Sequence, residues 1–514
     1  MQIRNHSPEE LKLMIRDFTF PGYLELEECR KTVDDCLAGQ RTIKAKQEYL
    51  PPNKWQQTHE DEYRAFLRRA FFPGDTRYAL DVYEGLFCHG NPHVVLPPDG
   101  SLNYLISDAS VDGDGLKQIQ VRTNSGQMSH GLSCLLLETR ESPERPFFIQ
   151  EYVASKFLRA HFTQIDGESV ADFILLDEST FEYDLVHFRD TPVYRLRLLA
   201  LDANGLYYQR SIDPVELKEG FDVKNPPRDS RTIYPKIQGK TFNRIPFVWC
   251  GAFSLSGKTF DYPPLLNMAQ MELKLYMAMA YHSQHIYMNT QEFLVFTGVG
   301  KGFNMNDITV GAGGGVAFDK PDAKAYYCST NGVGFTAEKE EIEMLQAGIE
   351  EKRLSLMSAK SHQSGSVVGL IQSSQTAPLR QIVSISGDAI TKILRYMVQW
   401  LGYEQKDVES VQYIPSQQFA NASVNLSEFI SLSKAVMDGD VKMLESDLYR
   451  LAKESGYVKD SVTWEDFKQK YEIESEDRRS KQAIVVKSSG NPFARTNGFN
   501  NAAKENNGME NEDI

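Results

Sequence analysis

The residues of this chain that most suggest chemistry are Ala252 to Thr259, whose sequence AFSLSGKT satisfies a relaxed phosphate-binding loop pattern with Ala in the first glycine position. Such a loop binds phosphate through backbone N–H groups and through the N-terminus of the helix that follows. Here Phe260 to Tyr262 lead directly into Pro263 and Pro264, and a residue before proline is disfavoured in the helical region. We therefore expect no helix to begin after Lys258, and a nucleotide site there is the weaker alternative.

Other candidate motifs have simpler interpretations. The glycine-rich segments 298–302 and 311–315 lack the GxGxxG spacing, and turns at hairpin tips are favoured for them. His282 and His285 are three residues apart on a predicted helix, but no carboxylate or cysteine nearby in the sequence completes a metal site. We predict no bound metal, and a helix surface or interface for the two histidines. No Ser, His and Asp stand in a context typical of nucleophilic catalysis, although such triads are spatial.

Composition bounds the class of protein. The chain has 514 residues, so two or three folded units are expected. Its net charge of −14 argues against a broad nucleic-acid-binding surface, but is compatible with a surface past which DNA slides. The six cysteines are scattered without a CxxC pair, which predicts reduced thiols in a cytoplasmic protein.

Targeting signals are not expected. Ser7-Pro8-Glu9-Glu10 has the pattern of a capped helix start rather than of a secretory signal. The longest apolar run, Leu275 to Tyr281, is far shorter than the roughly 20 residues that a membrane span needs.

The elements before Pro263 form a helical part followed by a β-rich part. Apolar spacing and turn residues predict helices at 62–71 (capped by Thr58), 76–84, 116–127 and 148–162, and a buried strand at 132–137. From Asp172 to Ala252 the pattern alternates. Tyr194, Leu196 and Leu198 share one face with Arg195 and Arg197 on the other, a turn follows at 202–205, and a strand is predicted at 245–250.

The stretch from Pro263 to Leu401 is unusual. Leu265 to Gln291 predicts a long helix that is apolar on nearly every side, and such a helix is buried all round. Covering it with copies of the same chain in an oligomer is the simplest solution. A glycine-punctuated β excursion follows (292–335), then a charged helix from Ala337 to Ala359 capped by Thr336, a polar loop (361–377) and a helix at 379–401.

After Tyr403 the chain is again predicted helical to about Ile473, with a helix pair at 426–437 and 441–452. The Asn-rich tail from about Ser475 has too little apolar content to order itself.

In combination and order, several segments resemble the portal proteins of tailed bacteriophages, most closely a portal-like family catalogued as a domain of unknown function. The segments that carry the resemblance are Tyr49-Leu50-Pro51, Tyr63 to Phe71, Ile245 to Val248, Pro263 to Leu266 and Ala323 to Tyr327. It spans roughly Leu50 to Trp400. It implies a multidomain α+β fold that assembles into a ring of identical subunits, usually twelve, at one capsid vertex.

The resemblance also implies a division of the chain. The expected parts are a wing (1–262, β-rich at 170–252), a first stem helix (263–291), a clip (292–335), a second stem helix (336–360), a tunnel loop (361–378), a long wing helix (379–402), a helical crown (403–474) and a disordered tail (475–514).

Partners follow from the same resemblance. They are further copies of the chain, the large terminase subunit, head-completion or tail adaptor proteins, a major capsid or scaffold protein, and double-stranded DNA passing through without sequence preference. We expect a virion protein assembled in the host cytoplasm, with no enzyme activity, no cofactor, no metal and no membrane contact.

Particular residues are assigned to these contacts. The DNA-facing group is Lys352, Arg353, Lys360, His362, Gln363 and Ser364. The clip residues that would contact terminase or adaptor are Lys301, Asn304, Asp307, Lys320 and Lys324. The subunit-interface group is Leu273, Tyr276, Met277 and Met279. Two alternatives stay open: another structural head protein, such as a head-tail adaptor or minor capsid protein, and a P-loop NTPase that uses Lys258.

Overall fold

The computed structural model describes residues 6–165, 167–186, 188–290, 293–299, 321–328, 334–354, 365–416 and 465. The chain divides into two units, Met1–Phe419 and Ala420–Ile514, and every element below belongs to the first. The predicted helices at 426–437 and 441–452 and the tail from 475 lie outside the described residues.

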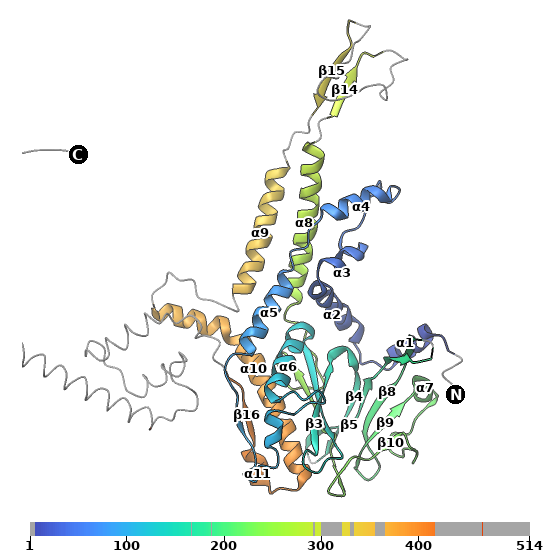
Figure 1. Cartoon of the computed structure of the whole chain (residues 1–514), viewed down its shortest axis with the longest axis vertical. Coiled ribbons are helices and arrows are strands. Elements are labelled where there is room, and N and C mark those ends of the chain that lie inside the picture. The colour runs from blue at the N-terminus through green and yellow to red at the C-terminus, as the bar shows by residue number, and fades with distance from the viewer. Residues whose placement is uncertain are drawn as a thin grey trace, which may run out of the picture. The chain divides into compact units, whose positions relative to one another are not determined.

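Two antiparallel sheets form the body of the first unit (Figure 1). In the smaller sheet β2 (Leu132–Thr139) lies between β3 (Phe147–Val153) and β13 (Phe247–Gly251). The larger sheet has the order β10 (Thr232–Ile233), β9 (Tyr207–Ile212), β8 (Leu196–Leu201), β5 (Glu168–Asp177) and β4 (Phe157–Ile165). Two-stranded pairs are β1 (His93–Val95) with β16 (Gln412–Ile414), β6 (Thr180–Asp184) with β7 (Arg189–Val193), β11 (Lys236–Ile237) with β12 (Lys240–Thr241), and β14 (Phe293–Thr297) with β15 (Lys324–Cys328).

The alternating pattern of β8 sets the two faces of the larger sheet. Leu196 and Leu198 pack in a cluster with residues of α1 (Pro8–Asp17) and α7 (Pro214–Glu219), whereas Leu199 belongs to the cluster shared with the smaller sheet. The predicted turn after β8 and the strand that follows it are confirmed. So is the capping box of Ser7 and Glu10 at the start of α1.

Arg197 keeps the expected alternation, on the face opposite Leu196 and Leu198, but it is half-buried because the smaller sheet covers that face. It donates hydrogen bonds to Glu138, to Gln209 Oε1 (2.6 Å) and to Tyr152 Oη (2.8 Å), which come from three other strands. Burial alone would lower the pKa of Arg197, but the charge of Glu138 outweighs it and raises the pKa. A paired, fully hydrogen-bonded charge is tolerated where a lone one is not.

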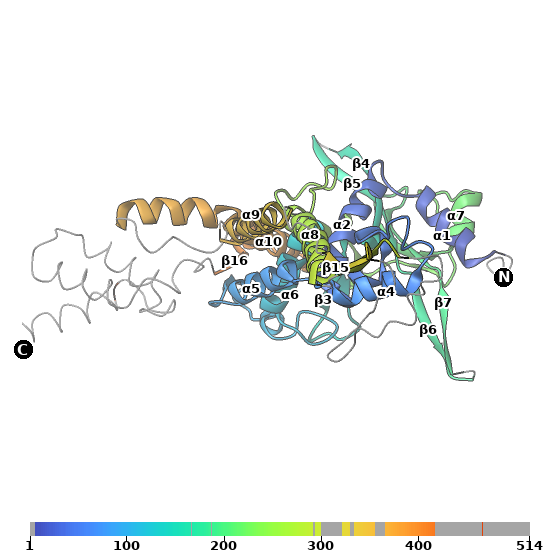
Figure 2. The ribbon, with the colours of Figure 1, turned by 90° about the horizontal axis from the view of Figure 1, so that it is seen from above.

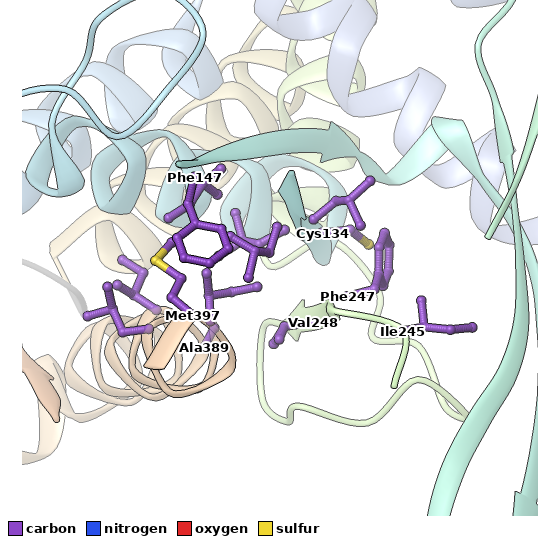
Figure 3. Close-up of a cluster of buried hydrophobic side chains, with 14 of the residues drawn as sticks. Cys134, Phe147, Ile245, Phe247, Val248, Ala389 and Met397 are labelled. Carbon is purple, nitrogen blue, oxygen red and sulfur yellow. The ribbon is translucent and has the colours of Figure 1, made fainter. Parts of the chain in front are cut away.

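The largest apolar core lies between the smaller sheet, α6 (Leu116–His130) and α10 (Gly365–Leu401) (Figure 3). Phe147 of β3 and Val248 of β13 point toward Ala389 and Met397 on α10. The predicted helix at 116–127 and strand at 132–137 are therefore confirmed as α6 and β2.

A second core joins the N-terminal helices to the centre of the chain. It contains residues of α2 (Tyr23–Ala38), α3 (Gln40–Ala45), α4 (Glu60–Arg69), α5 (Asp75–Phe87), α8 (Leu266–Thr290) and α10. The expected cap of α4 at Thr58 is wrong, because the helix begins at Glu60 after His59. Figure 1 and Figure 2 both show α9 (Phe335–Leu354) beside α8.

The predicted helix at 148–162 is wrong, because this segment forms β3 and β4. Ile149 pairs with Leu137 of β2, and Phe157 pairs with Leu176 of β5. Short apolar runs fit both periods, and pairing with neighbouring strands decides between them.

The predicted loop at 361–378 is also wrong from Gly365 onward, since α10 begins there and continues to Leu401 with Pro378 inside it. Val367, Leu370 and Ile371 already have helical spacing in the sequence. Beyond α10, the expected helical stretch contains α11 (Gln405–Ser410) and then β16, which pairs with β1.

Candidate functional site: the helix pair and the segments around it

The surplus apolar surface of α8 is covered mostly by the same chain. Leu265, Met268 and Tyr276 belong to the core shared with the N-terminal helices. On another side Leu275 packs with Leu345 and Ile349 of α9. An oligomer is therefore not needed to bury the first half of α8.

The four predicted interface residues differ in how far the chain itself buries them. Tyr276 has no exposed surface, and its ring packs edge-on against Phe72 with centroids 5.8 Å apart, so the prediction that it contacts a neighbouring subunit is wrong. Leu273, Met277 and Met279 are half-buried, and their interface role stays a prediction.

Exposed apolar side chains lie further along α8 than expected. Ile286 is 45% exposed and Met288 41%, and Tyr281 and Tyr287 are exposed as well. The guanidinium of Arg69 lies over the Tyr287 ring, 4.0 Å from its centroid. On α9 the exposed apolar residue is Met344. Sequence reasoning missed these residues because the helix looked apolar on all sides.

Glu272 holds the N-terminal helices to α8. Its side chain is completely buried, and its two oxygens accept hydrogen bonds from the backbone N–H groups of Asp75 (2.6 Å) and Thr76 (2.9 Å). These are the first N–H groups of α5, which begins after Gly74 without a side-chain cap of its own. A carboxylate from another helix thus supplies the missing cap.

The two histidines of α8 meet a carboxylate that the sequence did not place near them. Nδ1 of His282 lies 3.1 Å from Oε2 of Glu338 on α9, and Nδ1 of His285 contacts Oε1 of the same side chain. Burial would raise the pKa of Glu338, but the hydrogen bonds with His282 and His285 together lower it. Among the described residues no group of three His, Cys, Asp or Glu side chains could hold a metal ion. The contacts of His282 and His285 with Glu338 link α8 to α9, as does the ion pair of Lys274 and Glu341 (3.2 Å).

The charged helix begins one residue before its predicted cap. Thr336 is its second residue, because α9 starts at Phe335. Lys352 lies exposed near the C-terminal end of α9 and interacts with other groups of the chain. Arg353 lies in the last turn of α9. Lys360, His362, Gln363 and Ser364 lie outside the described residues.

Between the two helices the chain forms the hairpin of β14 and β15. Phe293 pairs with Cys328, and Thr297 pairs with Lys324, whose side chain is exposed. Gly298 follows β14 with a φ of 72°, a left-handed conformation that glycine adopts at no cost. Lys301, Asn304, Asp307 and Lys320 lie outside the described residues.

The phosphate-loop pattern does not form a phosphate loop. No helix starts between Ala252 and Pro264, and α8 begins only at Leu266, as the two prolines predicted. Gly257 is required by packing instead, since a Cβ there would lie 2.6 Å from Trp249 Cδ2 and 2.8 Å from Phe162 Cζ. The Lys258 ammonium lies over the Phe162 ring, 5.3 Å from its centroid.

No helix in the described part of the chain has both the length and the apolar character to span a membrane.

Comparison with known proteins gives one family. Residues 264–401, less than half of the chain, match a family described as a domain of unknown function (DUF4055), and this description does not itself name a portal. No curated protein matches the chain.

Among solved structures, the chain is similar to one described as "Neck of empty GTA particle computed with C6 symmetry". The two share 10% sequence identity at a TM-score of 0.38, over 76% of this chain and 92% of the other. At that identity and TM-score the likeness assigns no function to this chain.

Proposed function

We propose that this chain is the portal protein of a tailed bacteriophage, the subunit of a ring through which DNA enters and leaves the capsid. The observation that carries the proposal is the order of elements in the matched region: a long helix, a β hairpin, a second helix antiparallel to the first, and the long helix α10. The resemblance in the sequence implies that order for stem, clip, stem and wing helix.

Two physical features support an assembly. Ile286 and Met288 lie on the exposed part of α8, next to the hairpin, where a neighbouring copy could cover them. The net charge of −14 suits a channel that DNA passes without binding tightly.

In this proposal α8 and α9 are the stem, and the β14–β15 hairpin belongs to the clip that contacts terminase and later the adaptor proteins. Lys352 and Arg353, near the end of α9, touch DNA phosphate transiently, together with the residues that follow them. A separate ATPase supplies the energy, and the lack of a helix that starts directly after Lys258 supports that division of labour. The chain is then a structural component of the virion.

The mass of the assembled protein tests the proposal. We expect mass photometry of the purified chain to give one species of about twelve copies of the 58.4 kDa chain. A chain that stays monomeric at micromolar concentration would favour a minor capsid role instead. Changing Ile286 and Met288 together to Ser should shift the mass toward monomer, whereas Leu13→Ser, an exposed apolar residue of α1, should not.

A further inference from the structure

A cavity of about 530 Å³ lies where four separate segments meet. Its walls come from β4 and β5 of the larger sheet, from β13 of the smaller sheet with the residues before it, from the segment around Gly257, and from α10. Small-molecule sites have volumes of roughly 300–1,000 Å³. The cavity plays no part in the proposed portal function.

Three cationic side chains from three of these segments line the cavity. They are Arg244, which precedes β13, Lys258 of the phosphate-loop-like segment, and Lys392 of α10. All three are exposed, so they lie where the cavity opens to solvent. None of the described residues that line it is acidic, in a chain whose net charge is −14. Three cationic side chains around one cavity of an acidic protein favour the binding of an anion there.

Lys258 is the cation on which the assignment rests. Arg244 and Lys392 also interact with other groups of the chain. The ammonium of Lys258 lies over the Phe162 ring, 5.3 Å from its centroid. A backbone hydrogen bond from Lys258 N to Ser256 Oγ (3.2 Å) fixes the segment that carries it.

The inner wall is aromatic and contains an unpaired donor. Phe162 and Trp249 both line the cavity, with ring centroids 5.3 Å apart. Trp249 is only 6% exposed, and its indole N–H has no hydrogen-bond partner within the described structure. A buried donor without a partner costs free energy, and a bound ligand with an acceptor would recover it.

We propose that this cavity binds a small phosphate monoester that carries a planar ring. Its phosphate, with a charge of about −2 near neutral pH, lies between Lys258, Arg244 and Lys392. The ring packs in the aromatic part beside Phe162 and Trp249, where planar groups stack favourably. The site holds the ester through side chains from several elements rather than through a helix N-terminus, so it differs from a P-loop and implies no hydrolysis.

Titration of the full-length protein with phenyl phosphate tests the proposal. We expect saturable binding by calorimetry, and a change in tryptophan fluorescence that disappears in Trp249→Phe. Lys258→Gln should weaken binding roughly ten-fold, the loss of one charge-assisted hydrogen bond. Lys236→Gln, an exposed lysine on β11 outside the cavity, should leave it unchanged. Circular dichroism confirms that both variants fold.

Several outcomes would overturn the proposal. The first is no binding of phenyl phosphate at millimolar concentration. The second is that Lys258→Gln and Lys236→Gln weaken the binding of phenyl phosphate equally. The third is that phenol alone, or inorganic phosphate alone, binds as tightly as phenyl phosphate. Because none of these depends on assembly, the result is independent of the ring test.

Discussion

Glu272 is a buried charge whose partners are backbone groups at the start of α5, nearly two hundred residues earlier in the chain. Glu272→Ala removes both acceptors and leaves two N–H groups unpaired, so we expect the free energy of unfolding to fall by about 3 kcal/mol. Glu272→Gln keeps one side-chain oxygen and should cost about 1 kcal/mol. Urea unfolding measures both.

The matched control is Glu340→Ala, an exposed glutamate of α9, which should change the stability by less than about 0.5 kcal/mol. Burial raises the pKa of Glu272 against the opposing hydrogen bonds from α5. A raised pKa means that the contribution of Glu272 to the free energy of unfolding is greatest at low pH and declines as the pH rises. The loss of stability caused by Glu272→Gln should therefore be smaller at pH 8 than at pH 4. The opposite trend would contradict the assigned burial.

Glu338 predicts a pH dependence of the opposite sign. Its pKa is lowered by His282 and His285, so its contribution to the α8–α9 contact is present above the ordinary glutamate pKa and is lost as pH falls through the lowered value. The protection factors of the backbone amides in the first turns of α9, that is, their exchange rates relative to the unfolded chain at the same pH, should therefore fall on acidification below about pH 4.5.

In Glu338→Gln the protection factors of the same amides should be lower already at neutral pH, with little further change on acidification. Equal acid sensitivity in Glu338→Gln and the parent chain would show that another group controls this contact.

At the scale of elements, the end of α9 and the residues after it carry the predicted DNA contacts. Changing Lys352, Arg353 and Lys360 together to Gln should reduce packaged or retained DNA several-fold, because each cation contributes to transient phosphate contact. Ring assembly should stay intact. Changing Lys236 and Lys240 to Gln, on β11 and β12, should leave packaging unchanged. Normal packaging by the triple variant would rule out this assignment.

Elements with a strong local pattern could be predicted from the sequence. The capped start of α1, the helix α6, the β8–β9 hairpin and the long helix α8 each follow from spacing and turn residues within one segment. Pro263 and Pro264 likewise excluded a helix after Lys258, because their effect on the preceding residue is local.

Features set by distant contacts could not be predicted. β3 and β4 have apolar spacing that also fits a helix, and only pairing with β2 and β5 decides. Tyr276 looked available for another subunit because its cover, Phe72, lies far away in the sequence. Glu338 is 56 residues from His282, so the histidines seemed to lack a carboxylate. The phosphate-ester cavity needs four segments that only the fold brings together.

For the whole molecule, the helix pair is anchored to its own chain over the first half of α8 and has exposed apolar residues toward the hairpin. This arrangement separates folding from assembly. The first half of α8 is buried within the chain's own cores, and in the proposed ring the later turns of α8 and Met344 of α9 are the surfaces that a neighbouring copy would cover. Interfaces of this kind, with an apolar centre on preformed helices, suit a symmetric homo-oligomer.

Electron microscopy of the purified full-length protein tests the central claim most directly. We predict closed rings of about twelve subunits with a central hole wide enough for double-stranded DNA, and with the exposed turns of α8 at the contact between neighbours. Monomers, open filaments or closed particles without a hole would contradict the portal assignment.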